Sequence, residues 1–401
     1  MPPVSPKSAR GLDWFTFLVA DMQTGFGPFL AIYLTTQKWN QADIGLILAV
    51  GSLGGLLSQL PGGWLVDAAP SKRRIAMIAV AGIGLSALLI AVAPSFAGIL
   101  SAKLLHVASS SILGPAIGAI TLGLVGHAAV APRLGRNARF ASIGSGTAAG
   151  IMGAIGFTIS AQAVFFVTAA LAIPAIVALS QISAEEIDPI RADGGIAGEV
   201  RAPGLAVRAL LRKRSLIILI LCIFLFHSAN AAMLPLVGTE MTLRAGEWAS
   251  LLIALCIIVP QGIVALMAPT VGRLAVELGR RTILIVGFAA LPARAALLAT
   301  SSDPAIIIAA QVLDGVCAAV LGVLVPLSLA DISRGTGRFN LTQGLTASAT
   351  GIGAALSTTV AGYLATRFGT PMAFLALAVV AVTAFITVLV AMPETAENET
   401  R

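Results

Sequence analysis

Windows of about 18–22 residues with almost no charged side chain recur along the whole chain. A helix of about 20 apolar residues is long enough to cross the hydrocarbon core of a bilayer. About a dozen such windows use nearly all of the 401 residues, so no large soluble domain remains. Only 11% of the residues are charged, against roughly 25% in a typical soluble domain. The surface must therefore face something other than water, and we predict an all-α integral membrane protein.

Twelve transmembrane helices in two six-helix halves account for these windows. The longest polar stretch divides the first six windows from the last six. We therefore expect an N-terminal half over residues 1–180, a cytoplasmic linker over 181–214 with a short surface helix near 206–214, and a C-terminal half over 215–401. The twelve expected helices cover residues 12–35, 42–66, 75–93, 96–122, 140–160, 163–179, 215–239, 247–271, 282–300, 304–329, 339–366 and 371–392.

The loops between the windows differ strongly in their content of Lys and Arg. If the N-terminus is placed inside the cell, 20 of the 25 basic residues fall in inner loops and tails, and Lys38, Arg244 and Arg367 fall outside. The remaining two, Lys103 and Arg294, lie within windows. Positive residues concentrate on the cytoplasmic side of membrane proteins. We therefore expect a protein of the inner or plasma membrane with both termini in the cytoplasm.

Several classes of function are excluded by the same composition. The net charge of +7 resides in short loops, which indicates topology and not nucleic-acid binding. The three cysteines, Cys222, Cys256 and Cys317, lie inside apolar windows, which does not suit a disulfide framework. We find no phosphate loop, nucleophile elbow or metal-binding motif. We therefore expect no enzyme, no catalytic residue, no cofactor and no metal site.

Segments of the second half are similar to segments of the first at an offset of about 207 residues. This offset relates Lys103 to Gln311, His106 to Asp314, Gln23 to Asn230 and Pro28 to Pro235. Two parallel repeats are one known design of transporters, in which the binding site lies near the bilayer midplane.

One loop, which occurs once in each half, carries a resemblance to a known family. The first copy runs from Gly63 through Asp67 to Lys72-Arg73-Arg74, and the second from Gly272 to Gly279-Arg280-Arg281. Both resemble the loop Gly-x-x-x-Asp-x-x-Gly-Arg-Arg of the major facilitator superfamily. The first copy is two residues longer and lacks the second glycine. The second copy has Val276 at the position of the acid, with Glu277 beside it.

The resemblance covers essentially the full chain and implies a secondary transporter of the major facilitator fold. Gly63 allows two helices to approach closely, and Asp67 can accept hydrogen bonds at a helix end or pair with an Arg, which locks one state. An alternative is that these loops only anchor the topology. The closing Met392-Pro393-Glu394-Thr395 is similar to the end of the last helix in drug-exporting members. The expected gating residues are Gly63, Asp67, Arg73, Arg74, Gly272, Glu277, Gly279, Arg280 and Arg281.

Ionisable side chains inside the windows indicate where coupling takes place. Such residues are costly in lipid and usually face a cavity or one another. Asp21, Lys103 and His106 lie near the middle of their windows, and the last two share one helix face. Lys103 stands where drug:proton antiporters often carry an Arg. We expect Asp21 to accept a proton whose affinity Lys103 or His106 adjusts, although a silent buried pair would fit as well.

The C-terminal half carries a second polar set. We expect Arg294 and Asp314 to form a buried charge pair, with a structural role as the alternative. His227 and Asn230 share a face of one helix and can hydrogen-bond a substrate. The full set of expected substrate-cavity residues is Gln23, His227, Asn230, Gln261, Asp314, Asn340 and Gln343.

The leading hypothesis for function is proton-coupled efflux of a small, amphipathic organic molecule by a monomer. Its partners are then the substrate, protons and the lipid bilayer, and no nucleic acid. A proton-coupled uptake symporter of an organic solute is the main alternative. Export of a metalloid or soft metal through the three cysteines is a further reading, since soft ions favour thiolates. The last is a receptor or scaffold without transport.

Overall fold

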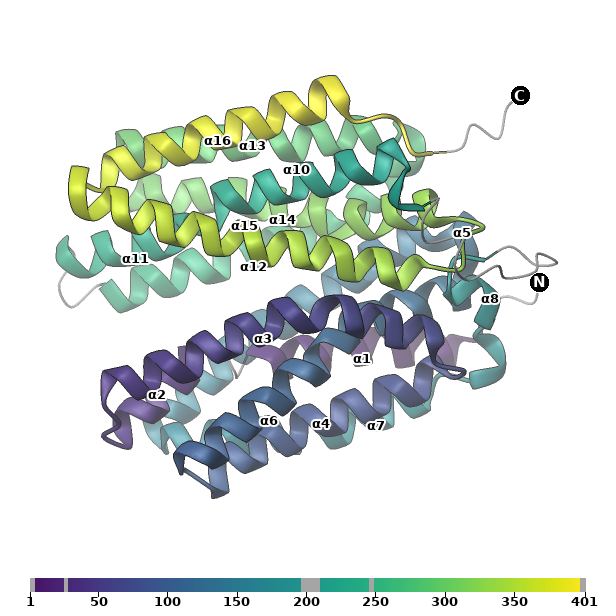
Figure 1. Ribbon diagram of the computed structural model, residues 1–401, viewed down its shortest axis with the longest axis horizontal. Helices are drawn as coiled ribbons and strands as arrows, with labels where there is room; N and C mark the ends of the chain where they lie inside the picture. Colours follow the sequence, from purple (N-terminus) through teal and green to yellow (C-terminus); the bar gives the residue numbers. More distant parts are fainter. Residues whose placement is uncertain (1–3, 25–27, 196–209, 245–248, 397–401) are drawn as a thin grey trace. The chain divides into compact units, whose positions relative to one another are not determined.

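The computed structural model describes residues 4–24, 28–195, 210–244 and 249–396, and all regular elements in these ranges are helical (Figure 1). The first group of helices comprises α1 Pro6–Thr24, α2 Pro28–Thr36, α3 Gln41–Ala68, α4 Lys72–Val92, α5 Phe96–Thr158, α6 Ala161–Ala170, α7 Ala172–Ser180, the 3₁₀ turn Ala184–Glu186 and α8 Pro189–Ala192. The second comprises α10 Arg214–Asn230, α11 Met233–Arg244, α12 Ala249–Glu277, α13 Arg280–Thr300, α14 Pro304–Ser333, α15 Phe339–Phe368 and α16 Thr370–Ala391.

Nine helical stretches of the described residues are long and apolar enough to cross a membrane. One of them, α5, has 63 residues, which at 1.5 Å per residue is about 95 Å and thus two crossings. Gly126 interrupts α5 with φ 68° and ψ 177°, a left-handed conformation that glycine adopts without strain. The α1–α2 pair and the Thr-, Ser- and Gly-rich α15 are not among the nine, but they lie at the first and eleventh expected windows. Within the described residues, helices thus occupy each of the twelve expected windows.

The helices extend beyond the apolar windows from which they were expected. α12 ends at Glu277 and α14 at Ser333, six and four residues after the expected ends at 271 and 329. The segment 123–139, expected as a loop, is largely helical within α5. Hydropathy marks where the bilayer ends, whereas the backbone hydrogen bonds of a helix continue into the polar region. Most of the expected surface helix near 206–214 lies in the range 196–209, outside the described residues.

The structure forms two compact units. Unit 1 comprises Met1–Val130, Phe140–Arg201 and Ser333–Leu345, and unit 2 comprises Ala131–Arg139, Ala202–Ile332 and Thr346–Arg401. The units differ from the sequence halves because the beginning of α15 packs within unit 1 and a short piece of α5 within unit 2.

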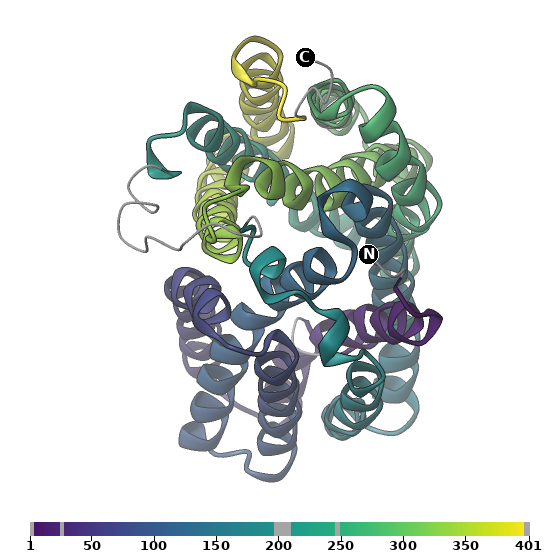
Figure 2. The same ribbon diagram turned by 90° about the vertical axis from the view of Figure 1, so that its right-hand side faces the viewer.

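The same pairs of helices pack together in the two units, and Figure 2 shows many of the helices nearly end-on. In unit 1, α4 packs against α6 and α7, and α1 packs against α7. In unit 2, α13 and α10 both pack against α16. The first and third crossings of each half thus contact the sixth, which is the packing expected of an internal repeat.

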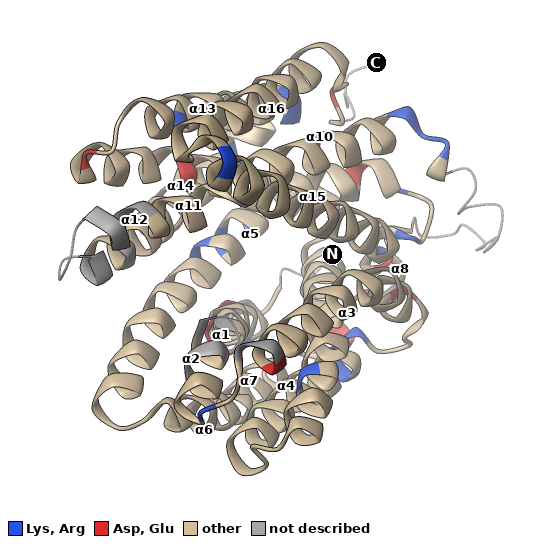
Figure 3. Ribbon diagram, turned by 60° about the vertical axis from the view of Figure 1, so that its left-hand side comes forward, with Lys and Arg blue, Asp and Glu red and all other residues tan. Residues whose placement is uncertain are grey.

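Large apolar side chains cover the outside of the helices. Leu57 is 74% exposed, Phe157 92% and Val390 76%. Charged residues are sparse along the ribbons, which have long uncharged stretches (Figure 3). Apolar surface of this extent is stable only against lipid or protein, so the exposed helix faces suit a bilayer.

Candidate functional site

Asp67, near the end of α3, caps the beginning of α15. Its side chain is buried and accepts hydrogen bonds from the backbone N–H of Asn340 at 3.2 Å, from Asn340 Nδ2 at 2.9 Å and from the backbone N–H of Leu341 at 2.9 Å. The first amides of a helix have no partner within the helix and carry partial positive charge. These hydrogen bonds therefore offset part of the cost of burying the carboxylate. We call Asp67, Asn340 and Leu341 the Asp67 cluster; the partner of Asp67 is a helix end and not an Arg.

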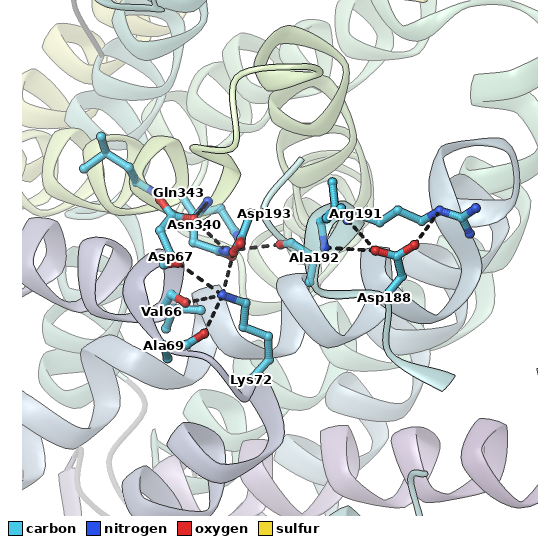
Figure 4. A network of polar contacts seen from close by, with 12 residues as sticks. Val66, Asp67, Ala69, Lys72, Asp188, Arg191, Ala192, Asp193, Asn340 and Gln343 are labelled. Carbon is cyan, nitrogen blue, oxygen red and sulfur yellow. Dashed lines mark hydrogen bonds and ion pairs between the residues drawn. The ribbon is translucent and has the colours of Figure 1, made fainter. Parts of the chain in front are cut away.

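Lys72 connects the end of α3 to Asp193 (Figure 4). Its Nζ donates to the carbonyl oxygens of Val66 at 2.6 Å and Ala69 at 3.0 Å, which terminate α3. The same Nζ forms an ion pair with Asp193 at 2.6 Å, and both side chains are only 2% exposed. A buried lysine needs such a set of acceptors because an unpaired ammonium group is costly away from water.

Four glycines allow helices to cross closely at two related places. A Cβ on Gly344 of α15 would lie 2.5 Å from the carbonyl oxygen of Gln59 in α3, and one on Gly63 would overlap that of Asn340. In unit 2, a Cβ on Gly135 would lie 2.5 Å from the carbonyl oxygen of Ala268, and one on Gly272 2.6 Å from that of Ala131. A shift of 209 positions relates Gln59 to Ala268, Gly63 to Gly272, Ala131 to Asn340 and Gly135 to Gly344.

The second loop, at the end of α12, makes its own contacts within unit 2. Arg280 Nε pairs with Asp331 at 3.0 Å, and its NH1 donates to the carbonyl oxygen of Ala275 at 3.0 Å. Glu394 accepts from the backbone N–H groups of Arg280 and Arg281 at 3.0 and 3.1 Å and so caps α13. Glu277 is exposed and has no hydrogen bond or ion pair with another described residue. It therefore does not replace Asp67.

Equivalent arginines of the two loops bind the last helix of each half. Arg73 NH1 donates to the carbonyl oxygen of Ile182, just after α7, at 2.6 Å. Arg281 NH2 donates to that of Leu389, near the end of α16, at 2.7 Å. Both satisfy carbonyl groups that a helix end leaves unpaired. The side chain of Arg74 makes no such bond among the described residues, and its backbone N–H donates to Ser71 Oγ.

Unit 2 contains a cavity of about 390 Å³. Its polar lining comes from His227 and Asn230 of α10, Asp314 of α14, and Thr346 and Thr350 of α15. The rest of the wall is mainly apolar and includes Ile223, Phe226, Leu321 and Val325. Cavities of about 300–1,000 Å³ with a mostly apolar wall and a few polar groups are typical of small-molecule sites.

A buried arginine organises the polar side of this cavity. Arg294 of α13 is 1% exposed and donates through NH1 to Asp314 Oδ1 and Asn230 Oδ1, both at 2.5 Å, and through NH2 to Gln311 Oε1 at 2.9 Å. The three acceptors fix Asn230 and Asp314 at the cavity wall. The side chain of Asp314 remains 20% exposed. A ligand in the cavity therefore meets Asp314 and Asn230, whereas the guanidinium lies behind them.

Comparison with known proteins identifies the family. The sequence profile of the Major Facilitator Superfamily matches residues 14–291 and 248–401. In each of two strains of Mycobacterium tuberculosis, an uncharacterized MFS-type transporter is 38% identical to this chain over 404 residues, which cover 99% of this chain and 96% of the relative. The chain belongs to the major facilitator superfamily.

Solved major facilitator structures share the fold. The human organic anion transporter MFSD10 superimposes with a TM-score of 0.73 at 14% identity, over 96% of this chain and 100% of that one. The Escherichia coli fucose:proton symporter FucP superimposes with a TM-score of 0.75 at 15% identity, over 95% and 97%. The expected major facilitator fold is confirmed, and the chain is a membrane transporter and not an enzyme.

The expected proton-coupling residues are not joined to one another. Asp21 of α1 is 7% exposed and makes no hydrogen bond or ion pair with another described residue. Lys103 of α5 likewise has no such partner, and its side chain packs against Gly51 of α3. His106 is buried one turn further along α5. The three residues all belong to unit 1, but the structure forms no Asp21–Lys103 pair.

Several of the expected cavity residues lie elsewhere. Asn340 is fully buried in the Asp67 cluster, and Gln343 Nε2 donates to Asn340 Oδ1 at 3.2 Å, so neither lines the cavity. Gln23 Oε1 accepts from Ser110 Oγ at 3.0 Å within unit 1. Gln261 lies on α12 and does not line the cavity of unit 2. His227, Asn230 and Asp314 line the cavity of unit 2.

The cysteines do not form a metal site in the described part of the chain. Cys222, Cys256 and Cys317 are all buried and free. No three His, Cys, Asp or Glu residues of the described ranges lie close enough together to hold a metal ion. Cys317 lines the cavity, and its thiol donates to the carbonyl oxygen of Gly287 at 3.2 Å.

Three residues that make these contacts were given no role from the sequence. They are Lys72, Asp193 and Gln311. When the two halves are aligned, Asp331 corresponds to Gly123, so the first half has no carboxylate at this position. The missing carboxylate indicates that an acid from elsewhere in the chain, here Asp193, takes its place.

Proposed function

We propose that this major facilitator protein exports a small, amphipathic organic molecule in exchange for protons by alternating access. The observation that carries the substrate class is the cavity of unit 2, where His227, Asn230 and Asp314 lie at a wall that is otherwise mostly apolar. A molecule with a single polar end and an apolar body matches this lining. A sugar, which needs hydrogen bonds around its whole ring, matches it poorly.

Proton coupling is assigned to Asp21. A buried carboxylate without a partner in a membrane helix is costly as an anion, so proton binding stabilises it. When the group is exposed to water, the ionised form is favoured and the proton is released. This change couples proton binding to the conformational cycle. Lys103 and His106 lie on α5, which contacts α1 through the hydrogen bond of Ser110 Oγ to Gln23 Oε1.

The Asp67 cluster is assigned to gating. Three hydrogen bonds hold the first turn of α15 against α3, and the close approach at Gly63 leaves no room for water between them. Access from this side, which we expect to be cytoplasmic, requires these contacts to break. The Asp67 cluster then stabilises the state that is closed to the cytoplasm.

The proposal is tested by a screen of a deletion strain against many toxic compounds, followed by transport of each hit in oriented vesicles. We expect sensitivity of the strain and export of the compound by the protein. The variant Thr350→Val changes the cavity wall and should raise KM several-fold. Thr383→Val, on an exposed face of α16, is the control and should leave KM unchanged. Lower accumulation of the compounds in the deletion strain would indicate uptake and refute export.

A further inference from the structure

The two gating loops use a basic residue in the same way. Lys72 Nζ binds carbonyl oxygens at the end of α3, and Arg280 NH1 binds that of Ala275 near the end of α12. A shift of 208 positions relates Lys72 to Arg280 and also relates Gly123 to Asp331. In both loops the basic group satisfies unpaired carbonyls at a helix end.

The carboxylate partner of this basic residue differs between the units. In unit 2 it is Asp331, which belongs to the neighbouring membrane helix α14. The equivalent position in α5 is Gly123, which has no side chain. A Cβ at Gly123 would lie 2.8 Å from Ile187 Cγ2 and 3.1 Å from Ala192 Cβ, so the linker segment occupies this space. Asp193 of the linker then supplies the carboxylate to Lys72.

The same linker segment binds the beginning of α15 through consecutive carbonyl groups. The carbonyl oxygen of Ala192 accepts from Asn340 Nδ2 at 3.2 Å, that of Asp193 from the backbone N–H of Phe339 at 3.0 Å, and that of Gly194 from the backbone N–H of Gly335 at 2.7 Å. Asn340 and α15 are also held by Asp67. The linker and Asp67 therefore both bind the beginning of α15.

The segment has a defined conformation of its own. Asp188 caps α8 by accepting from the backbone N–H of Ile190 at 2.9 Å and that of Arg191 at 3.1 Å. The backbone N–H of Asp188 donates to the carbonyl oxygen of Gly123 at 3.1 Å. Gly194 ends the turn with φ +76°, which favours glycine. Ala192 and Asp193 are almost fully buried. The linker segment 188–195 therefore has a fixed structure that packs against unit 1.

We propose that residues 188–195 of the linker form a latch that closes over the beginning of α15, with Lys72 and Asp193 as its positioning residues. In unit 2 the acid is fixed on a membrane helix, whereas in unit 1 it lies on a segment that can leave its site. Docking of the latch stabilises the closed state of the Asp67 cluster, and its release precedes opening. This inference concerns the control of gating and does not depend on the substrate or the coupling ion.

The test measures access to a residue that the latch covers. Ser333 is fully buried, and its Oγ lies 3.3 Å from where a Cβ of Gly194 would be. Ser333→Cys, in a background with Ser at positions 222, 256 and 317, is reconstituted in nanodiscs and labelled with N-ethylmaleimide. Asp193→Ala should raise the labelling rate about tenfold, the order of the change expected when a bond to a charged group is lost. Asp193→Glu should restore slow labelling.

Two controls separate release of the latch from loss of the fold. Asp331→Ala removes the equivalent acid in unit 2 and should leave labelling at position 333 unchanged. Ser328→Cys, fully buried in α14, should stay unlabelled in every variant. Unchanged labelling at position 333 in Asp193→Ala would overturn the proposal. Faster labelling at position 328 in the same variant would also overturn it, since the effect would then be general unfolding. Neither result depends on whether the protein exports or takes up a substrate.

Discussion

The substitution Asp67→Asn is expected to loosen the start of α15 without changing the shape of the side chain. Asp67 is 4% exposed and accepts all three of its hydrogen bonds from Asn340 and Leu341. A hydrogen bond to a charged group contributes about 1.5–3 kcal/mol, and the amide still accepts weakly through its oxygen. We therefore expect a loss of about 2 kcal/mol for the closed state, which corresponds to roughly a 30-fold change in an equilibrium constant.

Amide hydrogen exchange measures this change without a substrate. The backbone N–H groups of Asn340 and Leu341 are protected by Asp67 alone among the described residues, because they lie in the first turn of the helix. In nanodiscs, the amides of Asn340 and Leu341, resolved with overlapping peptides that cover 339–345, should exchange about 30-fold faster in Asp67→Asn, and peptides of α13 and α16 should not change. Glu277→Gln is the matched control, since Glu277 lies in the second loop and bonds to no described residue. Equal exchange in wild type and Asp67→Asn would refute the role of Asp67 in closing this end.

Three further predictions concern stability and packing. Arg294→Met leaves the partly exposed carboxylate of Asp314 without its cation and should cost about 3 kcal/mol, the lower end for a buried pair, measured as a lower thermal midpoint in detergent. The double variant Arg294→Met/Asp314→Asn should recover part of this loss, and simple additivity of the two changes would contradict the pairing. Gly63→Ala should loosen the contact of α3 with the start of α15 because its Cβ overlaps the carbonyl oxygen of Asn340. Gly55→Ala, whose Cβ would have nothing within 4 Å, should leave the thermal midpoint unchanged. Similar thermal midpoints for both variants would refute the close crossing. Gly272→Ala should destabilise unit 2 in the same way because its Cβ would lie 2.6 Å from the carbonyl oxygen of Ala131. Gly262→Ala is its neutral control. An unchanged thermal midpoint for Gly272→Ala would argue against the equivalent crossing in unit 2.

The helices and their number could be predicted because lipid imposes a simple rule on the sequence. A charge-free window such as 371–392 crosses the membrane whatever its neighbours are, and α16 follows it within a residue at each end. The contact of Arg294 with Asp314 could also be predicted, since two opposite charges inside the membrane usually pair with each other.

The partners of polar residues at the helix ends could not be predicted in the same way. Asp67 and Asn340 are 273 positions apart, and nothing local to either residue indicates the other. Asp193 lies in a polar stretch whose composition is typical of a solvated linker, yet its side chain is almost fully buried against Lys72. Such contacts are decided by the fold that brings the segments together. The comparison of Gly123 with Asp331 was the one local signal for the acid that Asp193 supplies.

The central claim is that substrate movement is coupled to protons through Asp21. The most direct measurement places purified protein in liposomes with a trapped pH indicator and imposes a gradient of an exported compound, with no other energy source. We expect the wild type to move protons against the compound and to acidify one side. Asp21→Asn should still exchange labelled for unlabelled compound but move no protons. Proton movement that is unchanged in Asp21→Asn, or compound movement in the wild type without any change of pH, would contradict the account.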